Sequence, residues 1–436
     1  MVAEVSVGWA ASDDAVIDAC TAGADGLVMR VPVPDGDDPV PALARVYRVV
    51  LDRIGPDFDI TVVPTTETIG DHGVAVLGGT FDHLHAGHKL LLGAAMWAIR
   101  GSESPRLFVG LTTDAMLKNK AFADALEPYD ARVSNVITFC KTVDPRVLVT
   151  VVPLNDMFGP SLRSDVDVLI VSRETESGAA VVNEKRVQLG ERSIPVVVVD
   201  TIGVHGSMEK LSSTAIRRKI VRNRHLQTRW SALMTRLGVS ETMAKPWFER
   251  VCTLYESAGR HYHTLEHIDA MLRSLDEYAA PEEPRVVELA VWFHDCIYDV
   301  FRSDNEERSA DLADQFAAET GIDPGIAQAV RQFIVATKSH DLPGNASHDM
   351  KLFLDLDMAI LGSPPDLYVR YANAIWLEYQ PAYSREAFIA GRTRLLRNWL
   401  AKPALYHSTV VHDRLDAAAR KNIENELVSL NLPHPL

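Results

Sequence analysis

Short, uniformly apolar segments rich in β-branched residues recur through the first half of the chain. They predict buried parallel strands, because a strand covered on both faces shows no alternation of polar and apolar positions. Residues 88–100 and 131–143, which lie between such segments, carry the period of helices. The predicted strands span residues 74–79, 106–112, 146–152, 166–172 and 194–200. This alternation predicts a doubly wound α/β fold with ligands at the carboxyl ends of its strands.

The pattern changes near residue 225, after which the β-branched runs disappear. Helical periodicity marks the segments 265–278, 285–298 and 307–319. We therefore expect a multidomain chain of three parts. A Rossmann-like α/β domain with a parallel sheet occupies residues 71–225, and an all-α domain follows at residues 226–436. Residues 1–70, with weak strands and Gly/Asp/Pro-rich turns, form a reduced α/β lobe to which the sequence assigns no role.

Composition and charge restrict the class of protein. A length of 436 residues suggests two or three domains, and 47% hydrophobic with 24% charged residues is typical of globular proteins. The net charge of −15 argues against a general nucleic-acid binder. The four cysteines form no C-x-x-C pair. We expect a cytoplasmic protein without a membrane span, and the sequence leaves the formation of a homo-oligomer open.

The first candidate site is the stretch GGTFDHLHAGHKLLL at residues 78–92. Gly78 and Gly79 permit a tight turn and a close approach of the backbone to a ligand. His88 falls at the predicted helix start, where free N–H groups and the helix dipole attract phosphate. His85 and His88 can donate hydrogen bonds to a phosphate without a metal. The alternative, an ordinary turn with incidental polar residues, explains the whole stretch less well.

This stretch resembles the H-x-G-H signature of the nucleotidyltransferase superfamily, and more specifically phosphopantetheine adenylyltransferase. A second family motif, S-S-T-x-x-R, is present within residues 211–217. The segments GLTTDAMLKNKAF, VPLNDMFGPS and VSRETESGAAVVNEKR are similar to the eukaryotic and archaeal branch of that family. The resemblance runs from about residue 74 to residue 222.

The resemblance implies that the phosphate of 4′-phosphopantetheine attacks the α-phosphorus of ATP, with Mg²⁺ accompanying the nucleotide. His88 would contact the reacting phosphates, and either Lys118 or Lys120 would meet the incoming phosphate. The residues that the resemblance assigns to ATP or substrate binding are Gly78, Gly79, Thr80, Phe81, His85, Arg173, Ser212, Ser213, Thr214 and Arg217. An adenylyl- or cytidylyltransferase for another small phosphate is the alternative.

The second candidate site combines histidines and aspartates of the helical half. His263 and His267 are four residues apart, which predicts one face of a helix. His294 and Asp295 lie in an apolar run, where a charged aspartate has to be paired, hydrogen-bonded or metal-bound. Two imidazoles with two carboxylates suit a divalent ion such as Mn²⁺, Fe²⁺, Mg²⁺ or Zn²⁺. The second carboxylate is Asp355 or Asp357, which share another apolar stretch.

This set resembles the HD superfamily of metal-dependent phosphohydrolases over residues 228–431. The resemblance implies His267, His294, Asp295 and Asp355 as metal ligands, with Asp355 preferred over Asp357. Similarity to cyclic-nucleotide phosphodiesterases implies that His263 is a general acid. Glu306 and His340 are candidates to activate water or hold a second ion, with helix-surface or capping roles as the alternative. The substrate would be an unknown phosphate ester or nucleotide, and the alternative is a regulatory module that binds a nucleotide without turnover.

Overall fold

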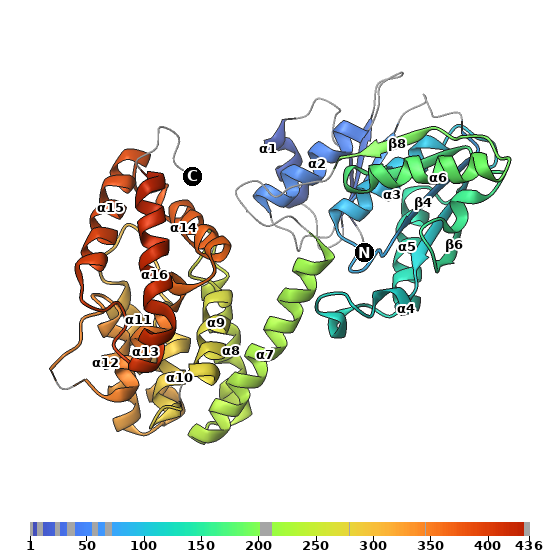
Figure 1. Cartoon of the computed structure of the whole chain (residues 1–436). Coiled ribbons are helices and arrows are strands. Elements are labelled where there is room, and N and C mark those ends of the chain that lie inside the picture. Colours follow the sequence, from blue (N-terminus) through green and yellow to red (C-terminus); the bar gives the residue numbers. More distant parts are fainter. Residues whose placement is uncertain are drawn as a thin grey trace. The chain divides into compact units, whose positions relative to one another are not determined.

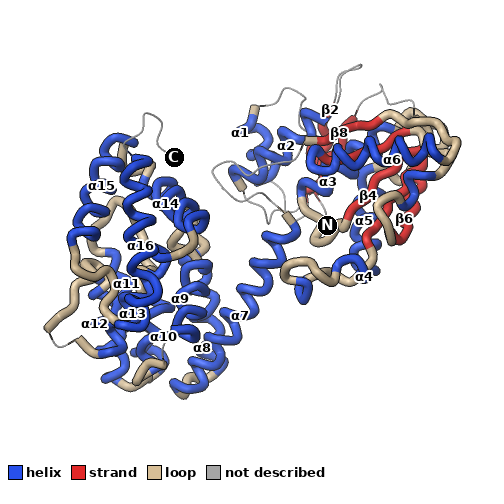
Figure 2. The backbone as a smooth tube through the Cα atoms, in the orientation of Figure 1, coloured by secondary structure: helices blue, strands red, loops and turns tan. Residues whose placement is uncertain are grey.

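The computed structural model of the protein forms two compact units, Met1–Val221 and Arg222–Leu436. The residues that it describes are 3–6, 12–21, 27–32, 40–54, 60–65, 72–200, 212–278, 280–344 and 346–430. All the strands among them belong to the first unit, and the second unit contains only helices as regular structure (Figures 1 and 2). This confirms the predicted fold class. The boundary between the units falls within helix α7 (Ser213–Leu237).

The first unit is built on a five-stranded parallel sheet of order β6-β5-β4-β7-β8. Its strands are β4 (Val74–Gly79), β5 (Arg106–Thr112), β6 (Leu148–Leu154), β7 (Val168–Ser172) and β8 (Val196–Val199). The strand order reverses at β4, which pairs with both β5 and β7. In such sheets a ligand binds beside the reversal, at the carboxyl ends of the strands.

Helices cover both faces of this sheet. Helices α3 (Ala86–Ala98) and α5 (Tyr129–Val143) pack on one face and share a core with Ala75 and Leu77 of β4. Helix α6 (Glu176–Gln188) packs on the other face, where its core includes Val74 and Val76. Consecutive residues of β4 thus point into two different cores, which explains its uniformly apolar sequence.

Residues 1–70, expected as a reduced α/β lobe, contain a second parallel sheet of order β1-β2-β3. Its elements are β1 (Ala3–Ser6), α1 (Asp13–Thr21), β2 (Leu27–Pro32), α2 (Val40–Arg53) and β3 (Ile60–Thr65). Leu43 and Ile60 belong to the same buried core as helix α3. The amino group of Lys89, in α3, donates a hydrogen bond of 2.9 Å to the carbonyl oxygen of Ile60. The lobe is therefore packed on the helix that carries the H-x-G-H motif.

The second unit is a helical domain with one large core. Its helices after α7 are α8 (Glu241–Tyr255), α9 (Leu265–Tyr278), α10 (Pro284–Phe293), α11 (Asn305–Thr320), α12 (Pro324–Ala336), α13 (His348–Asp357), α14 (Pro365–Tyr379), α15 (Arg385–Ala401) and α16 (Thr409–Leu430). Trp230, Trp292 and Phe316 lie at the centre of this core, and the two indole rings meet edge to face at 5.1 Å. These large aromatic side chains fill the space where several helices of the domain converge.

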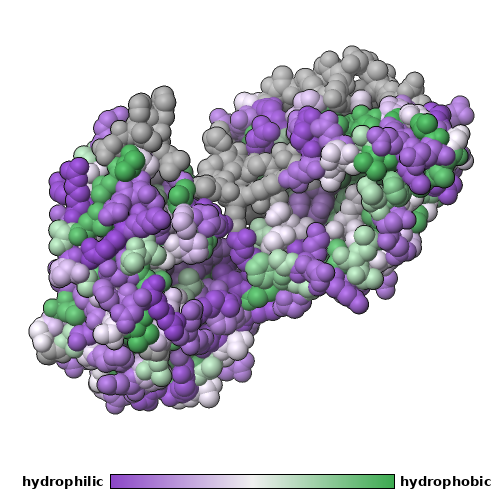
Figure 3. Space-filling view, viewed as in Figure 1, coloured by the Kyte–Doolittle hydropathy of each residue, from purple (hydrophilic) through white to green (hydrophobic). Residues whose placement is uncertain are grey.

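Hydrophilic side chains predominate on the face of the second unit that Figure 3 shows, with apolar side chains scattered among them. Phe301 is the most exposed large apolar residue, at 71%. Scattered exposed apolar residues are normal for a globular protein. Within the described ranges, no helix combines the length and the apolar character that crossing a membrane requires.

A glycine beside helix α13 gives a test of this packing. Gly362 ends the short 3₁₀ helix η4 (Ala359–Gly362), and a Cβ atom there would lie 2.6 Å from Cβ of Leu415 and 2.9 Å from its carbonyl oxygen. Because backbone atoms cannot yield as side chains do, we expect Gly362→Ala to lower the free energy of unfolding by about 1–3 kcal/mol. Urea unfolding followed by circular dichroism measures it.

The matched control is Gly391→Ala in helix α15, where an added Cβ would meet no described atom within 4 Å. Alanine is a better helix former than glycine, so this variant is expected to gain about 0.5–1 kcal/mol. Equal effects of the two substitutions would contradict the proposed packing of η4 on α16.

Candidate functional sites of the two units

A strained turn joins β4 to α3 at the carboxyl edge of the sheet. Phe81 and His83 have positive φ angles of 48° and 46°, which are uncommon for residues other than glycine. Phe81 is fully buried, and a Cβ atom at Gly79 would lie 3.0 Å from its ring. A larger residue at position 79 would therefore press on the Phe81 ring where the strand ends. The turn brings the chain over its own strand before the helix begins.

The two histidines of the H-x-G-H motif lie at the start of α3. His85 is the residue that caps the helix, His88 is in its first turn, and their rings stack with centroids 3.9 Å apart. A Cβ atom at Gly87 would lie 3.2 Å from the His85 ring, so the middle glycine leaves room for that ring. Burial, and then the charge of His85, lower the pKa of His88 well below its usual value.

The ring of His88 is consequently neutral at physiological pH. Its Nδ1 atom is buried and has no hydrogen-bond partner among the described residues. Such an atom at a helix N-terminus can exchange a hydrogen bond with a phosphate oxygen. The structure thus places His85 and His88 together, where the sequence predicted a phosphate cradle.

A buried ion pair joins the H-x-G-H motif to the start of α7. Arg217 donates hydrogen bonds to Asp82, to the carbonyl oxygen of Ala121 at 3.1 Å and to Oγ1 of Thr214 at 3.1 Å. Asp82 is fully buried and Arg217 is 2% exposed. We expected Arg217 to hold ATP phosphates, but its guanidinium is engaged inside the chain. These contacts connect the two motifs, and the part of Arg217 in binding ATP stays a prediction.

The serine-rich motif forms the first turn of α7. The Oγ atom of Ser212 accepts a hydrogen bond of 3.2 Å from the backbone N–H of Ala215, as a helix cap does. Ser213 and Thr214 follow in the first turn and are half-buried. Leu211, which precedes the motif, lies outside the described residues. The free N–H groups of this helix end form a second place that favours phosphate.

Arg132 of α5 holds the carboxyl edge together and was missed by the sequence analysis. It is fully buried and donates hydrogen bonds of 2.9 Å to the carbonyl oxygens of Thr80 and Thr112. It also donates to Asp114 at 2.7 Å and to the carbonyl oxygen of Glu127. Because it joins the ends of β4 and β5, it fixes the backbone of Thr80.

The three cations predicted to meet phosphate or substrate all follow the carboxyl ends of strands. Lys118 and Lys120 come after β5, are exposed, and their side chains make no hydrogen bond or ion pair with any residue that the structure describes. Arg173 follows β7, but its guanidinium binds Asp200 at 2.9 Å and Glu176 at 3.1 Å. Both lysines are therefore available to an incoming phosphate, and Arg173 would have to leave its carboxylates.

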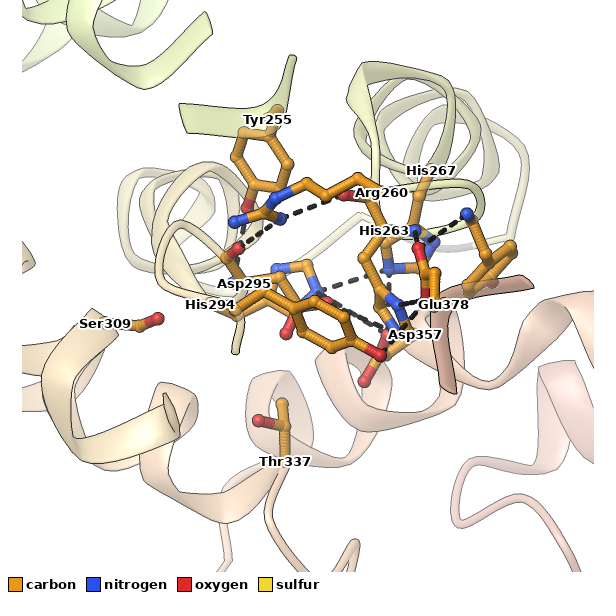
Figure 4. A network of polar contacts seen from close by, with 12 residues as sticks. Tyr255, Arg260, His263, His267, His294, Asp295, Ser309, Thr337, Asp357 and Glu378 are labelled. Atoms are coloured by element: carbon orange, nitrogen blue, oxygen red, sulfur yellow. Dashed lines mark hydrogen bonds and ion pairs between the residues drawn. The ribbon is translucent and has the colours of Figure 1, made fainter. Parts of the chain in front are cut away.

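Four candidate metal ligands converge in the second unit (Figure 4). They are His267 of α9, His294 and Asp295 at the end of α10, and Asp357, the last residue of α13. One ligand atom of each lies within 4.8 Å of the others. Nε2 of His267 is 3.2 Å from Nε2 of His294 and 3.0 Å from Oδ1 of Asp357, and Asp295 is 3.1 Å from Nε2 of His294.

The fourth member of this group is Asp357, and the expected ligand Asp355 lies elsewhere. Residues two apart on a helix point about 200° apart, so only one of the two can face the centre. Asp355 is 1% exposed and accepts hydrogen bonds of 2.6 Å from the backbone N–H groups of His407 and Ser408. Its carboxylate stabilises a loop and does not join the metal group.

The donor set fits a divalent ion. Nδ1 of His294 donates a hydrogen bond of 3.0 Å to the carbonyl oxygen of Val291, which fixes the tautomer and leaves the Nε2 lone pair directed at the group. Two imidazole nitrogens 3.2 Å apart repel each other unless a cation or a proton lies between them. Two such nitrogens with two carboxylates are typical ligands of Mn²⁺, Fe²⁺ or Zn²⁺.

His263 lies beside this group, but in the turn before α9, since the helix begins at Leu265. Its Nδ1 atom donates a hydrogen bond of 2.7 Å to Glu378, and its Nε2 atom is 4.0 Å from Oδ2 of Asp295. Burial lowers the pKa of His263, but the carboxylates of Glu378 and Asp295 outweigh it and raise the pKa above its usual value. The ring therefore retains a proton more readily than a free imidazole.

Glu378 of α14 orients this histidine. One of its oxygens accepts hydrogen bonds from the backbone N–H groups of His261, Tyr262 and His263 at 2.7, 2.8 and 3.0 Å. Although burial opposes ionisation, the charge of His263 and these hydrogen bonds lower the pKa of Glu378 to about 2. The sequence analysis missed Glu378, whose signal was a glutamate in the apolar and aromatic run 375–379.

The two remaining candidates lie outside the ligand group. Glu306 is half-buried in the first turn of α11. The hydrogen bond of Glu307 raises the pKa of Lys338, and the charge of Glu306 adds to this. His340 contacts the group from outside, with its Nε2 atom 2.8 Å from Oδ2 of Asp357. Neither side chain supplies an atom to the four-ligand group.

Comparison with known proteins assigns the first unit. The cytidylyltransferase-like family matches residues 76–219. A phosphopantetheine adenylyltransferase of Saccharomyces cerevisiae is 44% identical over 149 residues, which are 33% of this chain and 48% of that protein. An uncharacterized protein of Schizosaccharomyces pombe is 33% identical over 188 residues, 39% of this chain and 58% of that protein. The chain thus spans about half the length of these two relatives.

An archaeal relative is matched over nearly its whole length. The phosphopantetheine adenylyltransferase of Pyrococcus abyssi is 34% identical over 147 residues, which are 34% of this chain and 89% of that protein. The matched part of this chain therefore accounts for most of the length of that protein.

The ion pair between Asp82 and Arg217 gives a test of the link between the two motifs. Asp82→Asn leaves the Arg217 guanidinium buried opposite a neutral side chain, so we expect a loss of roughly 3–5 kcal/mol in the free energy of unfolding. Urea unfolding of the full chain measures this. Asp165→Asn is the matched control, because its ion pairs with Arg106 and Arg163 are partly exposed and should cost less than about 1 kcal/mol. Equal losses would contradict the buried link.

Proposed function

Because the chain belongs to the phosphopantetheine adenylyltransferase family, we propose that its first unit transfers the adenylyl group of ATP to 4′-phosphopantetheine. An oxygen of the acceptor phosphate attacks the α-phosphorus of ATP. The bond from that phosphorus to the oxygen bridging to the β-phosphate breaks, and dephospho-CoA and pyrophosphate are formed. The observation that carries the proposal is the match over 89% of the archaeal enzyme, with His85 and His88 together at the carboxyl edge of the sheet.

The chain's own groups position the reactants and stabilise charge on the phosphates. Thr80 and His88 contact the reacting phosphates, with the backbone of Thr80 held by Arg132. The first turn of α7 holds the triphosphate, and Mg²⁺ accompanies ATP. Lys118 or Lys120 neutralises the acceptor phosphate. No covalent intermediate is required, so positioning and electrostatic stabilisation supply the rate enhancement.

Removal of the His88 imidazole tests this assignment. We expect His88→Ala to lower kcat for pyrophosphate release from ATP and 4′-phosphopantetheine by about 10²–10³-fold, because a donor at the reacting phosphate is lost. His348→Ala, an exposed histidine at the start of α13, is the control and should leave kcat unchanged. A His88→Ala enzyme with normal kcat would exclude His88 from the reaction.

The same assay separates the proposed acceptor from its alternatives. Nicotinamide mononucleotide offered with ATP, and CTP offered in place of ATP, should give little product. Preferred turnover of either would show that the chain acts on another small phosphate.

For the second unit we propose a metal-dependent phosphohydrolase of a phosphate ester or nucleotide. The observation that favours it is the convergence of His267, His294, Asp295 and Asp357 with the His263–Glu378 pair beside them. A divalent ion bound by the four ligands would lower the pKa of a bound water and withdraw charge from a phosphoryl oxygen. A regulatory module that binds a nucleotide without turnover is the alternative.

The surrounding residues support a role for His263 as the proton donor to the leaving group. Its Nδ1–H is held by Glu378, so Nε2 faces the carboxylate of Asp295. Arg260 donates hydrogen bonds to the carbonyl oxygens of His263 and Asp295 at 2.9 and 2.8 Å (Figure 4). One guanidinium thereby fixes the backbone at His263 and the backbone at Asp295.

The ligand role of Asp357 can be tested by metal analysis. We expect Asp357→Asn to weaken Mn²⁺ binding by more than the roughly 10–100-fold typical of losing an outer partner, and to abolish Mn²⁺-dependent hydrolysis of 4-nitrophenyl phosphate. Asp366→Asn, a side chain that is 75% exposed in α14, is the control. Retained metal and hydrolysis in Asp357→Asn would exclude Asp357 as a ligand.

Tight Mn²⁺ binding by the unaltered chain, without turnover of any of a panel of phosphate esters and nucleotides, would favour the regulatory alternative.

A further inference from the structure

A closed ring of contacts connects the two aspartates of α13, although they point in different directions. Oδ1 of Asp355 accepts a hydrogen bond of 2.6 Å from the backbone N–H of His407. Nε2 of His407 donates a hydrogen bond of 3.1 Å to the carbonyl oxygen of His340. Nε2 of His340 in turn donates a hydrogen bond of 2.8 Å to Oδ2 of Asp357. Three segments distant in sequence, at residues 340, 355–357 and 407, are thus linked to one another in a ring.

The backbone of His340 is held in a conformation that its side chain does not favour. Its φ angle of 53° lies in the left-handed region, which is uncommon for a residue with a Cβ atom. The residue is fixed from both sides, since its N–H donates to the carbonyl oxygen of Ala336 at 3.1 Å and its own carbonyl oxygen accepts from His407. Such strain persists only where the surroundings enforce it, and here it aims the imidazole at Asp357.

The two oxygens of Asp357 have different environments. Oδ1 lies 3.0 Å from Nε2 of His267 and 3.6 Å from Nε2 of His294, inside the ligand group. Oδ2 accepts the hydrogen bond from His340 outside it. A carboxylate held at one oxygen presents the other in a fixed direction, which is how outer partners strengthen metal binding.

We propose that His340 is a positioning residue that orients Asp357 toward a divalent ion, and that His407 and Asp355 hold His340 in place. This rests on the metal site proposed for the second unit. Asp355 supports the site through the loop at residues 407–408 without binding the ion. His340 acts through Asp357 and supplies no atom to the ion.

The experiment uses the metal-free full chain titrated with Co²⁺, whose visible absorption reports the ligand geometry. His340→Ala and His340→Gln both keep a Cβ atom at the same positive φ, so their backbone strain is matched. The glutamine amide can still donate a hydrogen bond to Oδ2 of Asp357. Thermal unfolding in the presence of a chelator shows that the two variants are equally folded.

We expect the wild type to bind one Co²⁺ per chain at this site and His340→Ala to bind it roughly 10–100-fold more weakly, with a changed absorption spectrum. His340→Gln should retain most of the affinity and the original spectrum. His407→Ala should weaken binding in the same direction but less, because the His340 side chain remains.

Two results would overturn the inference. One is an unchanged affinity and spectrum in His340→Ala. The other is binding of two Co²⁺ ions by the wild type and one by His340→Ala, which would make His340 a ligand of a second ion. This outcome can be told apart from that of the hydrolase proposal. Weakened Co²⁺ binding in His340→Ala, without hydrolysis by the wild type, supports the positioning role of His340 but not the hydrolase. Hydrolysis with unaltered Co²⁺ binding in His340→Ala supports the hydrolase alone.

Discussion

The cost of burying a carboxylate organises both units of this protein. A carboxylate removed from water is tolerated only when cations or N–H donors compensate it. Asp82 obtains Arg217, Glu378 obtains three backbone N–H groups and His263, and Asp355 obtains the N–H groups of His407 and Ser408. In each case the compensating group comes from a segment distant in sequence. Hydrophobic packing brings these segments together, and the buried charges fix their orientation to within a hydrogen bond.

The elements of the fold were accessible from the sequence because they depend on local patterns. The predicted strand at residues 74–79 coincides with β4, and the predicted helix at residues 265–278 coincides with α9. The predicted and observed helix boundaries differ where a helix begins in a polar turn. Helix α3 begins at Ala86, earlier than the predicted residue 88, because the cap residue His85 belongs to the motif that precedes it. Periodicity reports which face is buried, and caps decide where the helix starts.

The types of residue in the two sites could be predicted from the sequence. The hydrogen-bond and ion-pair partners of these residues could not. Asp355 and Asp357 occupy equivalent apolar surroundings in the sequence, and the direction of α13 against its neighbours decides which one faces the histidines. The ion pair of Arg217 with Asp82 could not be found from the sequence, because the two residues are 135 positions apart. Glu378 belongs to no sequence motif. Two of its hydrogen-bond donors are backbone N–H groups, and the sequence does not indicate where such groups lie.

Two groups of acidic residues and histidines show how a metal site differs from a hydrogen-bonded cluster. Asp82, His83 and Glu127 also lie close enough to hold an ion. Asp82 accepts from Arg217 and from the N–H of Glu127, Glu127 accepts from His83 and Asn135, and Nε2 of His83 contacts the carbonyl oxygen of Ala125. All four carboxylate oxygens there have a partner within the chain, so an ion would have to replace hydrogen bonds that stabilise the fold. In the second unit the Nε2 atoms of His267 and His294 lie 3.2 Å apart, and each also contacts a carboxylate, that of Asp357 at 3.0 Å and that of Asp295 at 3.1 Å. Arg217 already neutralises the first group, whereas among the described residues the carboxylates of the second group pair only with histidines, which is why we propose a metal site for the second group alone.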